Sequence, residues 1–310
     1  QSGKVTDLVE YKYSPGDGWR VWENGQLSNY NSRFKRDAQR SCDYYPASYR
    51  EWWENSGILE SSLSKMRVVF SENDKSKTQA NRRSGKINTR ALGKRAPVGD
   101  DRLFKKKTFP KKRDYAVLIM VDMSGSTMGG RLTMEMNAVI AQAELLSRLG
   151  IKFSVVAHSG TLSRDSASSY GYENRHSREY AFVKVVLKDW NEPWSTNQLE
   201  AAKNLFSYDC NLDGHAMTFA RTEILKQRAS DRLVMYYSDG QMPAENYDEE
   251  LALLKKELKT LSMQGVIVAG VGVNTDSPTK HGLPTVRLDE EKDVPKVVDH
   301  LERLMMEARG

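Results

Sequence analysis

The chain has 310 residues and a net charge of +6, and hydrophobic residues make up 39% of it, which excludes a chain that is disordered throughout. The two cysteines, Cys42 and Cys210, lie far apart without a CxxC spacing, which argues against a disulfide scaffold or a zinc site and fits a reducing compartment. No apolar run approaches the roughly 20 residues of a membrane-spanning helix, and no signal peptide is evident. We therefore expect a cytoplasmic protein with no membrane contact.

The first 73 residues are rich in aromatic side chains and hold four of the six tryptophans. The sequence suits a short hairpin around Val21, after the turn signal Asp17-Gly18, and a helix over residues 32–55. Apolar residues at steps of three and four predict a further amphipathic helix, namely Leu59, Leu63, Met66 and Phe70. We expect a mainly helical region over residues 1–73, which is either a small docking domain or a set of helices packed on the main domain.

Residues 74–113 form the most basic part of the chain. The segment from Lys75 to Arg113 contains fifteen Lys or Arg residues and only two acids, Asp100 and Asp101. It therefore carries a net charge of +13, and the rest of the chain carries −7. The segment is rich in Asn, Ser and Gly, and we interpret it as a linker. Clustered cations can neutralise phosphates, so nucleic acid is one partner that Lys75 to Arg113 would suit. No zinc finger or RRM accompanies it, and we favour either a non-specific role of the charge or an acidic protein partner.

A regular alternation of strands and helices begins at Asp114. The predicted strands cover residues 115–121, 151–157, 182–187, 232–237, 266–273 and 285–288. The predicted helices cover residues 131–149, 195–206, 217–228, 247–263 and 294–306. Such an alternation predicts an α/β domain over residues 114–310, with a doubly wound, mostly parallel sheet that is covered by helices on both faces.

Two acidic motifs follow predicted strands, at the edge where doubly wound sheets bind ligands. Asp122, Ser124 and Ser126 come directly after the first strand, and Asp239 comes after the strand over residues 232–237. Two carboxylates and two hydroxyls match the oxygen ligands that Mg²⁺ prefers, and Mn²⁺ or Ca²⁺ are alternatives. The structural alternative is that Ser-Gly-Ser caps the helix near Arg131 and that Asp239 forms a turn. We favour the divalent-cation site.

The pattern Asp122-x-Ser124-x-Ser126, with Ser238-Asp239-Gly240 further on, resembles the metal-ion-dependent adhesion site of von Willebrand factor A (VWA) domains. The resemblance implies a mostly parallel sheet with one antiparallel edge strand, and a cation whose coordination a partner's carboxylate completes. VWA sites usually add a threonine hydroxyl. Here the corresponding loop reads Asp213-Gly214-His215, so Asp213 or His215 would take that place, and an oxygen donor suits Mg²⁺ better than an imidazole.

A narrower resemblance covers roughly residues 80–310. Three segments are similar to the C-terminal VWA region of the cobaltochelatase subunit CobT: Lys188-Asp-Trp-Asn-Glu-Pro-Trp194, Cys210-Asn-Leu-Asp-Gly-His-Ala216 and Val268-Ala-Gly-Val-Gly-Val273. The segment Ser84-Gly-Lys-Ile-Asn-Thr-Arg90 resembles the linker of that family. CobT-like proteins also occur in phage genomes without an evident cobalamin pathway, so cobalt chelation does not follow from the resemblance.

The sequence contains no Gly-x-x-x-x-Gly-Lys-Ser/Thr phosphate loop and no paired nucleophile and base. We interpret His158 as a packed strand-end residue. We expect a non-catalytic, metal-dependent protein-binding subunit that works with an AAA+ ATPase of the MoxR or CobS type, or with an acidic client protein. The alternatives are a cobalt or magnesium chelatase subunit acting on a tetrapyrrole, and a nucleic-acid-associated factor. The polar residues 160–179 are expected at the metal-bearing edge.

Overall fold

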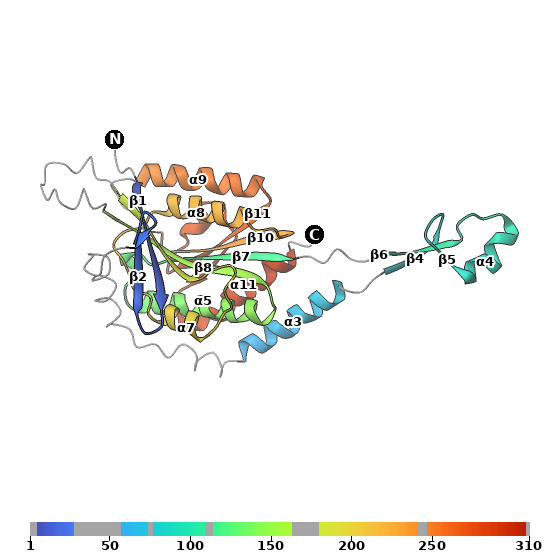
Figure 1. The fold of residues 1–310 in the computed structure, drawn as a ribbon, viewed down its shortest axis with the longest axis horizontal. Helices are drawn as coiled ribbons and strands as arrows, with labels where there is room; N and C mark the ends of the chain where they lie inside the picture. Colours follow the sequence, from blue (N-terminus) through green and yellow to red (C-terminus); the bar gives the residue numbers. More distant parts are fainter. Residues whose placement is uncertain are drawn as a thin grey trace, which may run out of the picture. The chain divides into compact units, whose positions relative to one another are not determined.

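A computed structural model describes residues 5–27, 57–73, 77–108, 114–162, 180–240 and 247–307 of the chain (Figure 1). The chain divides into two compact units. The first combines Gln1–Ser62 with Asp114–Gly310, and the second is Leu63–Arg113. Among the helices that the structure describes, none is long and apolar enough to cross a bilayer.

The first unit is built on a sheet whose strand order, in the described residues, is β12-β11-β10-β7-β8-β9-β1-β2-β3. In that order the strands are Thr285–Leu288, Val266–Val273, Asp231–Ser238, Tyr115–Asp122, Lys152–Leu162, Tyr180–Lys188, Val5–Ser14, Gly18–Glu23 and Gln26–Leu27. The strands β12, β11, β10, β7 and β8 run parallel to one another, and β9 runs antiparallel to β8. The predicted α/β fold with a mostly parallel sheet is confirmed.

Helices cover both faces of this sheet (Figure 1). One face carries α5 (Gly130–Arg148), α7 (Thr196–Lys203) and α11 (Val294–Glu307), and the other carries α8 (Asp213–Leu225) and α9 (Tyr247–Met263). The short helix α10 (Ser277–Lys280) follows β11. Because β7 lies between two helical layers, all eight of its side chains are buried, which explains its unbroken apolar sequence.

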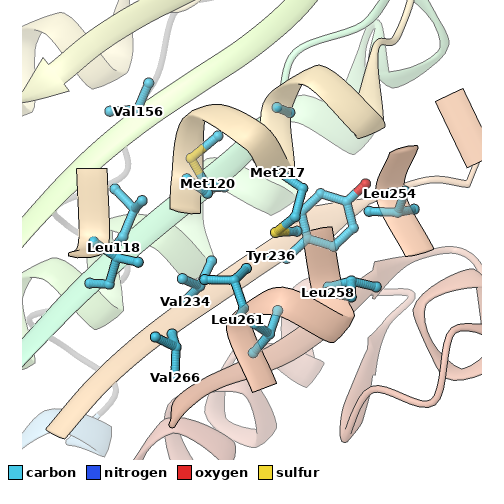
Figure 2. Close-up of a cluster of buried hydrophobic side chains, with 14 of the residues drawn as sticks. Leu118, Met120, Val156, Met217, Val234, Tyr236, Leu254, Leu258, Leu261 and Val266 are labelled. Carbon is cyan, nitrogen blue, oxygen red and sulfur yellow. The ribbon is translucent and has the colours of Figure 1, made fainter. Parts of the chain in front are cut away.

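The core under α8 and α9 is apolar (Figure 2). Leu118 and Val234 come from the sheet, and Met217, Leu254 and Leu261 come from the two helices. Each of these side chains is fully buried, and burying a side chain of this size contributes about 1.5–3 kcal/mol. This layer fixes the position of α8 on the strands that lead to the candidate site.

Hydrogen bonds supplement the packing on the opposite face. The Tyr237 hydroxyl donates to Oε1 of Gln142 over 3.1 Å, and Nε2 of Gln142 donates to the Val297 carbonyl over 3.4 Å. The Tyr115 hydroxyl donates to the Met305 carbonyl over 2.9 Å. These bonds satisfy buried polar groups and tie α5 and α11 to the sheet.

Residues 5–27 differ from the mainly helical region that the sequence led us to expect over residues 1–73. Residues 5–27 form β1, β2 and β3, and β1 pairs in parallel with β9, so that β9 is not the edge strand. The physical reason is that alternate side chains of these strands face the interior. Among them, Tyr11 and Trp19 pack on Phe206, with centroids 5.4 Å and 5.7 Å from that of the Phe206 ring, respectively. The predicted hairpin around Val21 is confirmed. The expected helix over residues 32–55 lies outside the described residues.

The amphipathic helix predicted after this region is present as α3 (Ile58–Asn73). Its residues Leu59, Leu63 and Met66 are buried, as the three- and four-residue spacing predicted, and the side chain of Phe70, the fourth residue of that pattern, lies outside what the structure describes. Glu60 of α3 pairs with Arg148 of α5, with 2.9 Å between Oε1 and Nη1.

The basic segment, which we interpreted as a linker, contains regular secondary structure. It contains a three-stranded antiparallel sheet of β4 (Lys77–Arg82), β6 (Phe104–Thr108) and β5 (Lys86–Ile87), together with α4 (Thr89–Arg95) and the 3₁₀ turn η1 (Ala96–Val98). Apolar alternation did not reveal these strands because the sheet has almost no core. The domain boundaries expected at residues 73 and 113 stay a prediction.

Candidate metal centre

The two acidic motifs meet at one edge of the sheet, because β7 and β10 are parallel neighbours. Asp122 is the last residue of β7, and Asp239 follows β10 directly. The backbone N–H of Asp239 donates to Oδ2 of Asp122 over 3.4 Å. The structure therefore brings together the two carboxyl groups that the sequence placed at equivalent strand ends.

Asp122 is held by hydrogen bonds on both carboxylate oxygens. Oδ1 accepts from the Ser124 backbone N–H over 2.9 Å, and Oδ2 accepts from Nδ2 of Asn211 over 3.0 Å. The backbone N–H of Asp122 donates to Oε1 of Glu135 in α5 over 3.0 Å. The Asp122 side chain has no solvent exposure, so its orientation is fixed by these partners.

The serine loop places two hydroxyls side by side. The Oγ atoms of Ser124 and Ser126 lie 2.9 Å apart. Adjacent ligands of an octahedral Mg²⁺, each about 2.1 Å from the ion, are about 3 Å from one another. The loop turns tightly at Gly125, whose N–H donates to the Asp209 carbonyl over 2.9 Å and where a Cβ atom would lie 2.8 Å from that oxygen. The spacing of the hydroxyls therefore suits neighbouring positions on such an ion.

Burial and mutual repulsion disfavour the charged forms of these carboxyl groups. Burial, followed by the charge of Asp239, raises the pKa of Asp122 from 3.8 to about 7. Burial, followed by the charge of Asp122, also raises the pKa values of Glu135 and Asp213 well above their ordinary range. In the part of the chain that the structure describes, no ion pair involves Asp122, Glu135 or Asp213. A bound cation would supply the missing positive charge.

The loop Asp213-Gly214-His215 lies where VWA sites usually have a threonine, and the side chains of Asp213 and His215 make different contacts. Asp213 begins α8, is buried, and has an Oδ1 atom without a hydrogen-bond partner among the described residues. His215 instead contacts Glu250 of α9, with 2.6 Å between Nδ1 and Oε1. Oε2 of the same glutamate accepts from the backbone N–H of Gly214 over 2.8 Å. Asp213 is thus the better candidate for a third contact with a metal.

The donor set indicates which metals suit the cluster. Among the described residues, no three His, Cys, Asp or Glu side chains converge closely enough to hold a metal by themselves. A metal here would therefore depend on the serine hydroxyls and on water as well as on carboxylates. Such an oxygen-rich, partly hydrated set fits Mg²⁺ and does not fit a structural zinc ion.

Three buried residues beside the cluster were missed or set aside by the sequence reasoning. Asn211 and Glu135 both contact Asp122. No sequence pattern marked them, because Asn211 lies in a loop and Glu135 lies among the mostly apolar buried residues of α5. His158 is fully buried, and its ring stacks on Tyr236 with centroids 6.2 Å apart. Burial lowers the pKa of His158 to about 3, so the ring is neutral near pH 7, which fits the interpretation of a packed residue.

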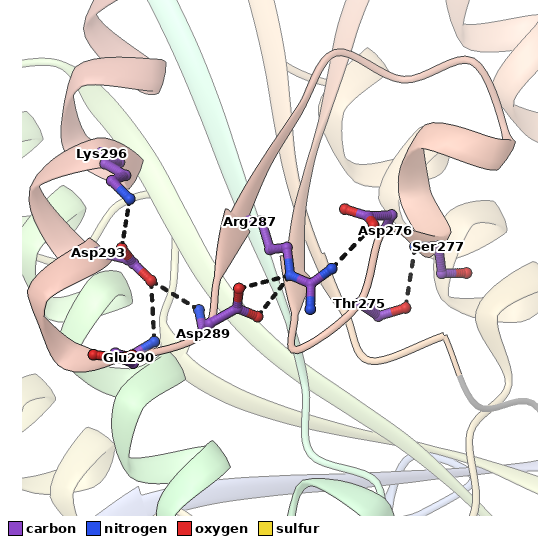
Figure 3. Close-up of polar contacts among 8 residues, drawn as sticks. All are labelled: Thr275, Asp276, Ser277, Arg287, Asp289, Glu290, Asp293 and Lys296. Atoms are coloured by element: carbon purple, nitrogen blue, oxygen red, sulfur yellow. Dashed lines mark hydrogen bonds and ion pairs between the residues drawn. The ribbon is translucent and has the colours of Figure 1, made fainter.

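The same edge carries the loops after β11 and β12 (Figure 3). Arg287 lies between Asp276, 3.0 Å away, and Asp289, 2.7 Å away. Asp293 accepts from the backbone N–H groups of Asp289 and Glu290, each over 3.1 Å, and so fixes the entry into α11. These contacts give the edge a set of ordered polar loops around the acidic cluster.

The edge continues at β8, which runs parallel to β7 as predicted and pairs His158 with Asp122. The strand extends beyond that level to Leu162, further than the sequence indicated. Of the polar residues 160–179, which were expected at the metal-bearing edge, 160–162 belong to β8 and 163–179 lie outside the described residues. Their position at the metal-bearing edge stays a prediction.

Comparison with solved structures finds proteins that are similar over part of the chain. A crystal structure of proximal thread matrix protein 1 from the mussel byssus is 12% identical with a TM-score of 0.44, covering 62% of this chain and 48% of its own. The vWF domain of the pili tip protein Mfa5 from Porphyromonas gingivalis is 10% identical with a TM-score of 0.43, covering 63% and 95%. A von Willebrand factor type A protein from Catenulispora acidiphila is 13% identical with a TM-score of 0.40, covering 64% and 43%. The chain thus spans about half of the mussel protein.

Comparison with family models gives the more informative match. Residues 103–307 match the model described as the cobalamin biosynthesis protein CobT VWA domain. The matched range includes every residue of the acidic cluster and the five parallel strands β7, β8, β10, β11 and β12. Because the match covers more than half of the sequence, this chain belongs to the CobT VWA domain family.

Proposed function

We propose that Asp122, Ser124, Ser126, Asp213 and Asp239 bind Mg²⁺, with Mn²⁺ or Ca²⁺ as substitutes. The observation that carries the proposal is a set of buried carboxyl groups beside two hydroxyls that lie 2.9 Å apart. Buried carboxylates repel one another, and a divalent cation between them favours their charged forms. Asp122, Asp213 and Asp239 then provide negative charge, and the two serines provide neutral oxygen ligands.

The same site would act as a docking point and not as a catalytic centre. A cation with few protein ligands keeps exchangeable positions, and a partner's Asp or Glu can replace water there. Membership of the CobT family supports a partner of the AAA+ class, of the MoxR or CobS type, because the sequence has no phosphate-binding loop of its own. In such an assembly this chain would supply binding and the ATPase would supply energy.

A second candidate is a subunit of a chelatase that inserts cobalt or magnesium into a tetrapyrrole. The family description, a cobalamin biosynthesis protein, favours it. Fold and family alone are a weak basis for chemistry. The two candidates differ in what they bind, since docking requires a partner's carboxylate at the cation and the chelatase role requires a tetrapyrrole.

Calorimetry tests the metal site. Asp122→Ala combined with Asp239→Ala should abolish the heat of Mg²⁺ binding, because both strand-end carboxylates are removed. Asp276→Ala is the matched control, since this exposed carboxylate lies at the same edge and pairs with Arg287. The control should titrate like the unmodified protein. An unchanged titration in the double variant would refute the metal site.

Surface binding kinetics against a purified AAA+ partner test the docking role. EDTA or Asp122→Ala should break the complex, because either removes the cation that receives the partner's carboxylate. A complex that survives both treatments would leave the metal as a structural element of the fold. Binding of a tetrapyrrole, with no metal-dependent partner, would favour the chelatase candidate.

A further inference from the structure

The residues 77–108, here called the basic arm, carry more positive charge than the arm itself can neutralise. They include eleven Lys or Arg residues and only two acids, Asp100 and Asp101. Both acids are already engaged. Asp100 pairs with Arg95 and Arg102 over 2.7 Å and 2.9 Å, and Asp101 pairs with Arg83 over 3.1 Å. Of the other cations of the arm, Arg82, Lys86, Lys105 and Lys106 belong to no ion pair among the described residues.

The arm also holds two like charges opposite each other. Lys86 of β5 is the direct cross-strand partner of Lys105 of β6. Like charges at directly opposite positions destabilise an antiparallel pair. Neither lysine belongs to an ion pair in the part of the chain that the structure describes. An external anion near both ammonium groups would relieve this repulsion.

Little apolar burial holds the arm together. Between residues 78 and 107, Ala91 is the one buried side chain among those described. The three strands have six, five and two residues. A small sheet needs an apolar face or a covering element for independent stability. We infer that contact with a partner contributes part of the stability of the arm.

A groove of about 940 Å³ lies on the arm. Its lining includes Arg82 and Lys106, neither of which belongs to an ion pair among the described residues, and Val98, which is 77% exposed. Two further apolar side chains of the arm, Ile87 and Leu92, are 52% and 44% exposed. Cations next to exposed apolar side chains suit a protein segment that carries both carboxylates and apolar residues.

We propose that the basic arm binds an acidic segment of a partner protein, in which Asp or Glu residues are interspersed with apolar side chains. The carboxylates pair with Arg82, Lys106 and the Lys86–Lys105 pair, and the apolar side chains cover Val98, Ile87 and Leu92. Single-stranded nucleic acid fits less well, because Phe104 is the one aromatic residue of the arm and single-stranded binding uses several rings for stacking, and duplex DNA is an outcome of the test below. The interaction is independent of the metal site.

Fluorescence anisotropy with the full chain tests this proposal with three labelled probes. They are a peptide of alternating Asp and Leu, poly-glutamate of the same charge, and random-sequence duplex DNA. We expect the Asp-Leu peptide to bind most tightly. Arg82→Glu with Lys106→Glu should weaken it by about tenfold or more. The matched control is Lys255→Glu with Lys259→Glu on α9, which makes the same change of charge outside the arm and should alter the Kd by less than about twofold.

The apolar part of the proposal has its own variant. Ile87→Ser with Leu92→Ser and Val98→Ser should lower the affinity for the Asp-Leu peptide to that for poly-glutamate. DNA that binds more tightly than both peptides, and loses its binding in the arm variant, would overturn the proposal in favour of nucleic acid. Peptide binding that is lost with EDTA or Asp122→Ala would also overturn it, because the peptide would then occupy the metal site. Failure of the arm is thus distinguishable from failure of the metal site.

Discussion

The side-chain amide of Asn211 joins the loop before α8 to the end of β7, because its Nδ2 donates to Oδ2 of Asp122 over 3.0 Å. Both side chains are buried. Oδ1 of Asn211 has no hydrogen-bond partner among the described residues. One face of the amide therefore positions Asp122, and the other has an acceptor oxygen that a cation, or water bound to it, can use.

Replacing this amide should affect both stability and metal binding. Asn211→Leu leaves Oδ2 of Asp122 buried with one donor fewer, so we expect the free energy of unfolding to fall by about 1–3 kcal/mol. The affinity for Mn²⁺ should fall about tenfold, because Asp122 loses its orientation. Urea denaturation and calorimetry measure the two effects. Asn197→Leu, on the exposed side of α7, is the control. Equal losses of stability and of Mn²⁺ affinity in the two variants would contradict the role of Asn211 in positioning Asp122.

The tight turn after Asp239 gives a second prediction. At Gly240, with a φ of +76°, an added Cβ would lie 2.4 Å from the Cβ of Ser277. Gly240→Ala should therefore displace the Asp239 loop and weaken Mg²⁺ binding in calorimetry. Gly282→Ala separates the causes, because its φ of +75° carries the same backbone strain while nothing lies within 4 Å of the added atom. If both variants bind Mg²⁺ as the unmodified protein does, the contact with Ser277 does not position the site.

The sequence predicted the sheet and the main acidic residues because both depend on local patterns. Apolar runs such as residues 115–121 and 266–273 match β7 and β11 closely, and the turn after each parallel strand has to reach the same edge. The positions of Asp122 and Asp239 follow from that rule alone. That the two residues lie next to each other depends in addition on the strand order, in which β10 pairs with β7.

The roles of Asn211, Glu135 and His215 could not be predicted in the same way. Asn211 acts through a hydrogen bond to a residue 89 positions away, and Glu250 draws His215 toward α9. Such contacts depend on how α8 and α9 pack, which no short pattern encodes. The basic arm was missed for a different reason, since strands without buried side chains lack the alternation that predicts them.

The N-terminal hairpin should contribute to the stability of the first unit. Trp19 is 5% exposed, packs on Phe206, and donates from Nε1 to the Asn204 carbonyl over 3.2 Å. Trp19→Ala should lower the free energy of unfolding by about 3–5 kcal/mol, because it removes a large buried ring. Trp22→Ala, at a half-exposed position of the same strand, should cost clearly less. Chemical denaturation measures both, and equal effects would mean that the hairpin does not depend on the contact with Phe206.

The raised pKa of Asp122 predicts how the metal-free protein responds to pH. Its pKa is about 7 in the folded state against 3.8 ordinarily, so between these values the folded state binds more protons than the unfolded state. Stability that the protonated carboxyl provides is therefore present near pH 4 and is lost as pH rises through about 7. Glu135 and Asp213, whose pKa values are also raised, act in the same direction.

Thermal unfolding in EDTA, measured between pH 5 and pH 8, should therefore show a Tm that falls as pH rises. Mg²⁺ should reduce or reverse the fall, because the cation favours the charged carboxylates. Its binding near pH 6.5 should release protons, seen as a binding heat that depends on the ionisation enthalpy of the buffer. Asp122→Asn removes one of these titrating groups and should make the fall of Tm in EDTA less steep. A variant whose Tm falls as steeply as that of the unmodified protein would show that Asp122 does not set the pH dependence.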